Sequence, residues 1–97
     1  MPTYVTLLNW TQKGIENISE SPSRLDTAKK AMKAAGAKIK GFYMTIGQYD
    51  MVIISEAPND EVVAKLALST GALGTVRTET MRAFTEEEYR KIITALP

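Results

Sequence analysis

The sequence contains no cysteine and no histidine. The absence of cysteine excludes disulfide bonds, thiolate nucleophiles, iron–sulfur ligation and most structural zinc sites. The absence of histidine excludes the usual proton carrier near neutral pH, the histidine-dependent catalytic dyads and triads, and histidine-ligated haem or metal. Carboxylates, lysine, arginine, tyrosine and hydroxyl groups remain for chemistry, and we expect neither a metal nor a cofactor.

Neither sign of charge is in large excess, and the sequence has no long apolar run. The 12 Lys and Arg residues oppose 11 Asp and Glu residues, for a formal net charge of +1, so no overall field attracts nucleic acid. No apolar run approaches the roughly 18 residues of a membrane span. Residues 1–4 lack the basic start and apolar core of a signal peptide. We therefore expect a cytoplasmic protein that binds neither nucleic acid nor membrane.

The spacing of apolar residues predicts the elements of a single domain that spans residues 1–97. Alternation with a period of two predicts strands over residues 3–10 and 75–84, and two more within residues 41–54, joined by a tight turn. Helical spacing predicts a helix over residues 15–35, with Pro22 marking an N-terminus, and a second helix that starts at residues 58–60. Thr85 and Glu88 form a capping box for a short C-terminal helix.

This order, β-α-β-β-α-β with an added helix, is typical of the ferredoxin-like α+β fold. It predicts a four-stranded antiparallel sheet, in the strand order 4-1-3-2, with both main helices on one face. The other face would be bare, yet both sides of strands one and three are apolar: Tyr4 and Leu8 oppose Val5 and Leu7, and Met51 and Ile53 oppose Val52 and Ile54.

An apolar bare face predicts that two copies of the chain associate. Face-to-face stacking of two sheets across a twofold axis gives a homodimer with the architecture of a dimeric α+β barrel. The alternative is that the C-terminal helix covers part of the bare face with its own apolar side chains, Tyr89, Ile92, Ile93 and Leu96.

The turn between the second and third strands contains Gly47, Tyr49 and Asp50. A turn with a purely structural role needs only glycine together with Asn, Asp or Ser. The additional aromatic residue indicates that this end of the hairpin contacts a ligand or a partner.

With these residues the chain resembles the GYD family, whose glycine, tyrosine and aspartate signature matches Gly47, Tyr49 and Asp50. Further family-like segments lie at residues 21–24, 56–58, 76–80 and 82–84, so the resemblance covers nearly the whole length. It implies a dimeric α+β barrel-like fold and a small protein without an established biochemical activity. It carries over no catalytic residue.

The predicted topology brings the end of strand one, the turn and the start of strand four to the same edge of the sheet. A candidate site at this edge comprises Trp10, Lys13, Tyr43, Tyr49, Asp50 and Arg77. Asp50 and Arg77 are placed to pair. In the structural interpretation Asp50 caps the turn and Arg77 neutralises it. In the functional interpretation Asp50 is a general base or ligand anchor, Arg77 holds an anion, and the aromatic residues form pocket walls.

Three functions fit this candidate site. The favoured one is a homodimer, or a higher oligomer, that binds a small apolar or aromatic acid in a cavity of the barrel through Arg77 or Lys13. The second is a cofactor-free enzyme on the scaffold of small isomerases and monooxygenases, with Asp50 removing a proton from carbon. The third is an assembly or interaction subunit. Without histidine an enzyme has few groups for acid–base chemistry at neutral pH, which favours binding.

Overall fold

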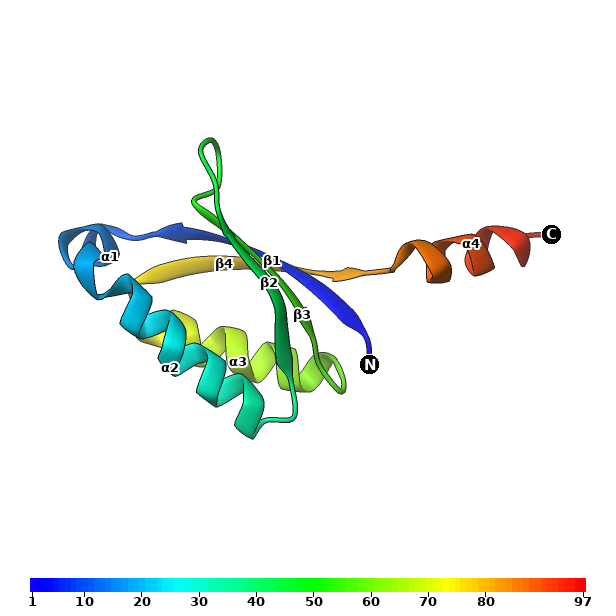
Figure 1. Cartoon of the computed structure of the whole chain (residues 1–97), viewed down its shortest axis with the longest axis horizontal. Helices are drawn as coiled ribbons and strands as arrows, with labels where there is room; N and C mark the ends of the chain where they lie inside the picture. Colours follow the sequence, from blue (N-terminus) through cyan, green and yellow to red (C-terminus); the bar gives the residue numbers. More distant parts are fainter.

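The computed structural model describes the whole chain, residues 1–97, and contains one antiparallel sheet with two long helices against one of its faces (Figure 1). The elements follow in the order β1 (Thr3–Trp10), α1 (Gln12–Glu16), the 3-10 helix η1 (Ile18–Glu20), α2 (Ser21–Ala34), β2 (Lys38–Met44), β3 (Met51–Glu56), α3 (Asp60–Ala72), β4 (Val76–Ala83) and α4 (Glu86–Thr94). The predicted succession of strands and main helices is confirmed.

The strands lie side by side in the order β2-β3-β1-β4, and each neighbouring pair is antiparallel. This is the predicted order, and it confirms the ferredoxin-like fold. Because β1 is paired on both sides, it sets the register of the sheet: Leu8 lies opposite Met51 of β3 and Thr78 of β4.

The core lies between the sheet and the helices, with Tyr4 at its centre. Tyr4 is only 3% exposed and packs with Ala37 and Ala57, and the helical residues around this group are Met32, Val62, Val63 and Leu66. The Tyr4 hydroxyl donates a hydrogen bond to the carboxylate of Asp60, the first residue of α3. This bond raises the pKa of the Tyr4 phenol.

The single helix predicted over residues 15–35 is wrong in its bounds and continuity, because helical structure starts at Gln12 and is divided into α1, η1 and α2. Thr11 caps α1 by accepting a hydrogen bond from the Gly14 N–H (3.2 Å), and its own N–H donates to the Thr75 carbonyl (3.0 Å). A Cβ on Gly14 would lie 2.0 Å from that same carbonyl oxygen. Only glycine fits this position, and it allows α1 to lie directly against the start of β4.

The second face of the sheet, which we call the open face, is not covered by α2 or α3. Side chains alternate along a strand, so Val5 and Leu7 point away from the side on which Tyr4 and Leu8 are buried. Residues directly opposite on paired strands share a face. The register therefore centres the open face on Val5, Leu7, Val52, Ile54 and Met81. The expectation that both sides of the central strands are apolar is confirmed.

The C-terminal helix α4 does not cover the open face. It continues along the direction of β4 and projects away from the sheet (Figure 1), and Tyr89, Ile92, Ile93 and Leu96 all remain exposed. The alternative in which this helix covers the bare face is therefore wrong. The capping box predicted for α4 is present, since Thr85 and Glu88 exchange hydrogen bonds of 2.9 and 3.2 Å.

The outer strands β2 and β4 form the two edges of the sheet. The register between β2 and β3 shifts between Ile39 and Gly41, and Lys40, at this bulge, forms an ion pair with Glu56 (3.8 Å). Bulges and charged side chains hinder the addition of a further strand at an edge. None of the helices has the combined length and hydropathy that crossing a bilayer requires.

Candidate functional site

The segment that carries Gly47, Tyr49 and Asp50 is a loop over residues 45–50 rather than a tight turn. Its base is closed by the Thr45 N–H, which donates to the Asp50 carbonyl (2.8 Å), and by the Thr45 hydroxyl, which donates to the Tyr49 carbonyl (2.5 Å). Gly47 has a φ of +142°, a conformation that side chains disfavour. The loop extends beyond the sheet (Figure 1).

Tyr49 fastens this loop to β4. Its hydroxyl donates a hydrogen bond of 2.6 Å to Glu79 Oε2. This bond with the carboxylate raises the pKa of the Tyr49 phenol. Since Glu79 lies opposite Leu7, the contact places the Tyr49 side chain over the open face.

Asp50 fastens the same loop to β1. One carboxylate oxygen accepts a hydrogen bond from the Trp10 N–H (3.0 Å), and the Asp50 N–H donates to the Leu8 carbonyl (2.9 Å). The side chain thus continues the pairing of β3 with β1 beyond the last strand residue. This differs from the structural interpretation, in which the aspartate caps its own turn, because the carboxylate bonds to the backbone of a different strand.

The expected ion pair between Asp50 and Arg77 does not form. The strand β1 lies between β3 and β4, so the two residues are two strand spacings apart, or about 10 Å. The Asp50 carboxylate is held at the nearer strand by the Trp10 N–H.

Arg77 and Tyr49 do come together, in a small hollow on the open face. The hollow has a volume of about 150 Å³ and is lined by Leu7, Asn9, Tyr49, Arg77, Thr78 and Glu79. A cavity of about this volume can hold a benzene-sized molecule, whereas drug-sized ligands occupy pockets of about 300–1,000 Å³. The hollow offers one guanidinium, one phenol and one aliphatic wall.

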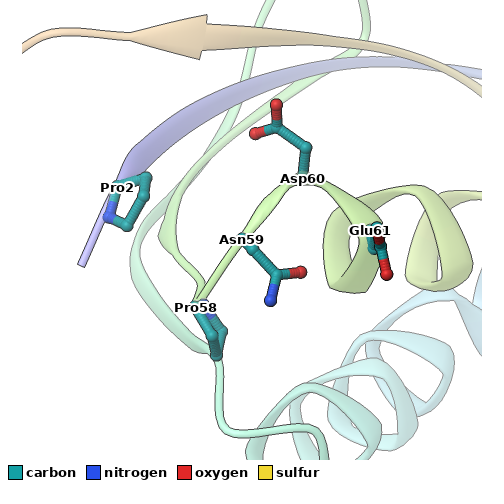
Figure 2. A pocket seen from close by; sticks show the side chains of 5 residues that line it. All are labelled: Pro2, Pro58, Asn59, Asp60 and Glu61. Atoms are coloured by element: carbon teal, nitrogen blue, oxygen red, sulfur yellow. The ribbon is translucent and has the colours of Figure 1, made fainter.

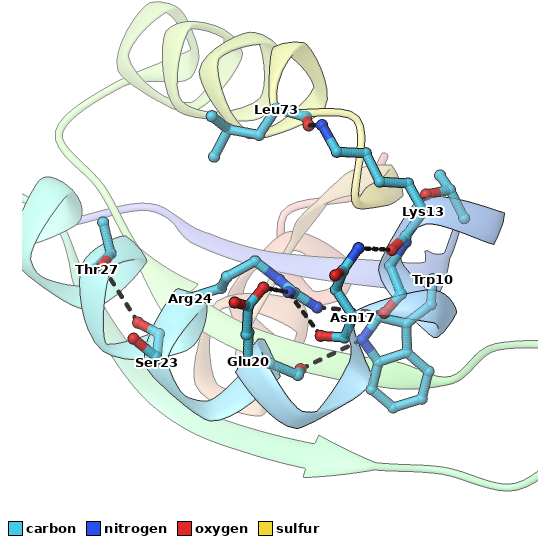
Figure 3. Close-up of polar contacts among 11 residues, drawn as sticks. Trp10, Lys13, Asn17, Glu20, Ser23, Arg24, Thr27 and Leu73 are labelled. Atoms are coloured by element: carbon cyan, nitrogen blue, oxygen red, sulfur yellow. Dashed lines mark hydrogen bonds and ion pairs between the residues drawn. The ribbon is translucent and has the colours of Figure 1, made fainter.

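The other predicted site residues lie elsewhere. The Trp10 indole N–H donates to the Ser21 hydroxyl (3.3 Å) on the helix side of the sheet (Figure 3). Lys13 donates to the Leu73 carbonyl at the end of α3 (3.2 Å), as Figure 3 also shows. Tyr43 is on β2, opposite Val52, with its ring against Gly41. The six predicted residues therefore do not form one pocket.

Two residues of this region were missed by the sequence prediction. Glu79 was identifiable from the register, because it is the carboxylate opposite Leu7 on the face to which the loop folds. Ile46 was identifiable from its unusual position, since it is a large aliphatic residue beside the glycine of a polar loop. It is fully exposed.

A larger hollow, of about 440 Å³, lies at the start of α3 (Figure 2). It is lined by the rings of Pro2 and Pro58 and by the polar residues Asn59, Asp60 and Glu61. Two of its three polar side chains have partners within the fold: the Asn59 side chain accepts from the Val62 N–H (3.0 Å), and the Asp60 carboxylate accepts from Tyr4. These groups cap α3 and anchor it to the core.

The anchoring role of Asp50 predicts two different outcomes for two substitutions. Asp50→Ala leaves the Trp10 N–H without its partner and should lower the free energy of unfolding by about 1.5–3 kcal/mol. Asp50→Asn keeps an oxygen acceptor at the same position and should cost about 1 kcal/mol or less. Urea unfolding at matched protein concentrations measures both. Equal stabilities of Asp50→Ala and the unmodified chain would contradict the anchoring role.

Comparison with known proteins identifies relatives of this chain. The model of the GYD domain matches residues 4–93. A Thermus thermophilus protein named "Glutamine synthetase and cystathionine beta-lyase binding protein" is 30% identical over 84 residues, which are 86% of this chain and 88% of that protein. The crystal structure of a protein from the same organism, TTHA0845, aligns with a TM-score of 0.51 and 23% identity over 88% of this chain and 95% of that one, which supports the fold. The chain therefore belongs to the GYD domain family.

Proposed function

We propose that this protein is a homodimer whose function is to bind another protein. The observation that carries the proposal is the amount of exposed apolar surface: only 8 of 97 residues are buried, and large apolar side chains are exposed on the open face, the hairpin loop and α4, as well as on α1, η1 and α3. Monomeric proteins rarely expose contiguous apolar patches of this kind unless they bind something.

The open face supports the homodimer. Its centre is aliphatic, and Met81 is 44% exposed there. Two copies of this face can stack across a twofold axis, because such an interface brings the same patch together from both chains. Sheets packed in this way lie about 10 Å apart and interdigitate their inward side chains.

The hairpin loop supports binding of a different protein. Ile46 is fully exposed in the loop that extends beyond the sheet (Figure 1), and Met44, the last residue of β2, is 70% exposed. The loop is held by the hydrogen bonds of Tyr49 and Asp50, so little conformational freedom is lost when a partner binds. A projecting aliphatic residue suits a groove on a protein surface.

The relative from Thermus thermophilus supports the kind of partner. Its name states that it binds glutamine synthetase and cystathionine beta-lyase. We propose that the partner of the present chain is a metabolic enzyme of the same kind.

A second candidate function is the binding of a small aromatic acid. The hollow beside Tyr49 is open in one chain, and a second sheet stacked on the open face would enclose it. Arg77 supplies a cation for a carboxylate, and Leu7 supplies an apolar wall. Catalysis by Asp50 stays a prediction. The hollow does not support it, since the Asp50 carboxylate is not among the groups that line it.

The homodimer predicts that the two sides of the molecule respond differently to a new charge. Met81→Asp buries a carboxylate between the sheets and should convert the dimer to monomers at micromolar concentration. Leu68→Asp is the matched control, since Leu68 is on α3 and is 75% exposed. Analytical ultracentrifugation measures both. A dimer that persists in Met81→Asp and dissociates in Leu68→Asp would place the interface on the helices instead.

Binding through the hairpin predicts a large effect of a fully exposed residue. Ile46→Asp should weaken binding to purified glutamine synthetase or cystathionine beta-lyase by at least about tenfold, the effect of a hot-spot residue, without changing the melting temperature. Gln48→Asp, in the same loop, should bind as the unmodified chain does. Isothermal titration calorimetry gives the affinities. Unchanged affinity of Ile46→Asp would exclude the loop as the binding element, and no binding to either enzyme would remove the support for this class of partner.

The small-acid candidate is tested by thermal shift with benzoate. At ten times its dissociation constant, a ligand stabilises the protein by about 1.4 kcal/mol, which raises the melting temperature of a domain of this size by about 5–10 °C. Arg77→Ala should abolish the shift while leaving the dimer intact. A shift that survives Arg77→Ala would place the ligand elsewhere.

A further inference from the structure

We propose that α4 is an arm that packs against a second copy of this chain. The proposal rests on the homodimer proposed above and adds to it a second contact surface, outside the sheet. It concerns the helix that follows the edge strand β4, whose apolar side has no cover within its own chain.

The pattern of α4 is that of a helix with a packing partner. Tyr89, Ile92 and Ile93 lie at the i, i+3 and i+4 positions that form one stripe of the helix, and Leu96, just past its C-cap, continues the spacing. The other side is occupied by ion pairs between Glu86 and Arg90 (2.8 Å) and between Glu87 and Lys91 (3.4 Å). A helix of 9 residues is below the roughly 12–15 residues at which isolated helices become even marginally stable in water. Packing of the stripe would supply the missing stabilisation.

The chain itself cannot supply that packing, because the connection to the sheet is short and held in place. Only residues 84–85 separate β4 from α4. The Arg82 guanidinium lies over the Phe84 ring, 4.6 Å from its centroid, and forms an ion pair with Glu88 (3.9 Å). It also donates to the Thr3 carbonyl (3.3 Å). These contacts tie the connection to β1 and the start of α4.

The resulting shape is extended. The molecule measures 52 × 31 × 18 Å and has a radius of gyration of 14.7 Å, compared with about 12.5 Å for a compact domain of this length. Figure 1 shows that α4 accounts for the extension, since it projects from the end of β4.

The area that a stable dimer needs identifies a second copy as the occupant. Four strands about 4.8 Å apart and about 23 Å long give the open face an area of about 440 Å². A standard interface buries about 800 Å² on each partner. An arm about 13 Å long and 10 Å wide covers about 130 Å². Each chain then contributes its open face, its own arm and the surface under the partner's arm, or about 700 Å² in all. The arms thus bring the sheet interface close to the size of a stable one.

The position and charge of α4 agree with this occupant. The strand β4 carries Met81 of the open face and runs directly into α4, so the arm is continuous with the proposed sheet interface. The acidic first turn, Glu86, Glu87 and Glu88, disfavours an anionic lipid surface as the alternative.

A matched pair of substitutions on α4 tests the arm. Ile92→Glu places a carboxylate in the apolar stripe of both arms and should raise the dimer dissociation constant about 100- to 10,000-fold, the effect of losing two buried aliphatic side chains. Thr94→Glu adds the same charge outside the stripe and should change the constant by less than about threefold. Sedimentation equilibrium of the 97-residue chain over a dilution series measures the constants, and circular dichroism checks that both variants are folded.

A second measurement locates the arm. Since the chain contains no cysteine, a nitroxide can be attached specifically to Lys91→Cys, whose native side chain is exposed on the polar side of α4. Chains that carry the nitroxide but no ¹⁵N are mixed with ¹⁵N-labelled chains that carry no nitroxide. The proposal predicts broadening of a confined set of amide signals in the ¹⁵N-labelled chain.

The outcomes separate this proposal from the homodimer. A weaker dimer in Ile92→Glu together with broadening between chains supports the arm. An unchanged dissociation constant, or the absence of broadening in the ¹⁵N-labelled chain of mixed dimers, overturns the arm and leaves the homodimer standing. A chain that remains monomeric at every concentration overturns both.

Discussion

A sheet has two faces, and the helices of this chain cover only one of them. Burial on the helix side depends on Tyr4, Leu8 and Met51, while the alternation of the same strands places Val5, Leu7 and Val52 on the other side. A chain of 97 residues buries only about 60–70% of its unfolded surface even when it is compact. The uncovered aliphatic face is therefore the constraint from which the proposed dimer, the hollow and the arm all follow.

The signature residues of the hairpin serve one mechanical purpose in the structure. Gly47 permits the backbone conformation of the loop, Tyr49 bonds to β4, and Asp50 bonds to β1. Two anchors on two different strands hold the loop more firmly than one turn would. Tyr49 and Asp50, which suggested a reactive site, thus hold the loop that presents Ile46, a fully exposed aliphatic residue.

The fold was predictable from the sequence because it depends on the spacing of apolar residues. The site was not predictable, since it depends on the direction in which individual side chains point. Alternation in β1 indicated both faces of the sheet, and Thr85 with Glu88 indicated the start of α4. Topology alone brought Trp10, Asp50 and Arg77 to one edge, but it does not say that the Trp10 side chain faces Ser21 or that Asp50 bonds to backbone. The direction of α4 depends on the contacts of Arg82, which no pattern of residue types reveals.

The bulge in β2 has a consequence for how copies of this chain can assemble. An outer strand with regular, unpaired backbone groups could add another chain and extend the sheet indefinitely. Here the register break at Ile39 and Gly41, beside Lys40, disturbs that template on one side. With lateral growth hindered at this edge, the proposed association is through the faces, and a contact across a twofold axis would end after two chains. A molecule with so much exposed aliphatic surface is thereby directed toward a closed particle and away from open-ended ribbons.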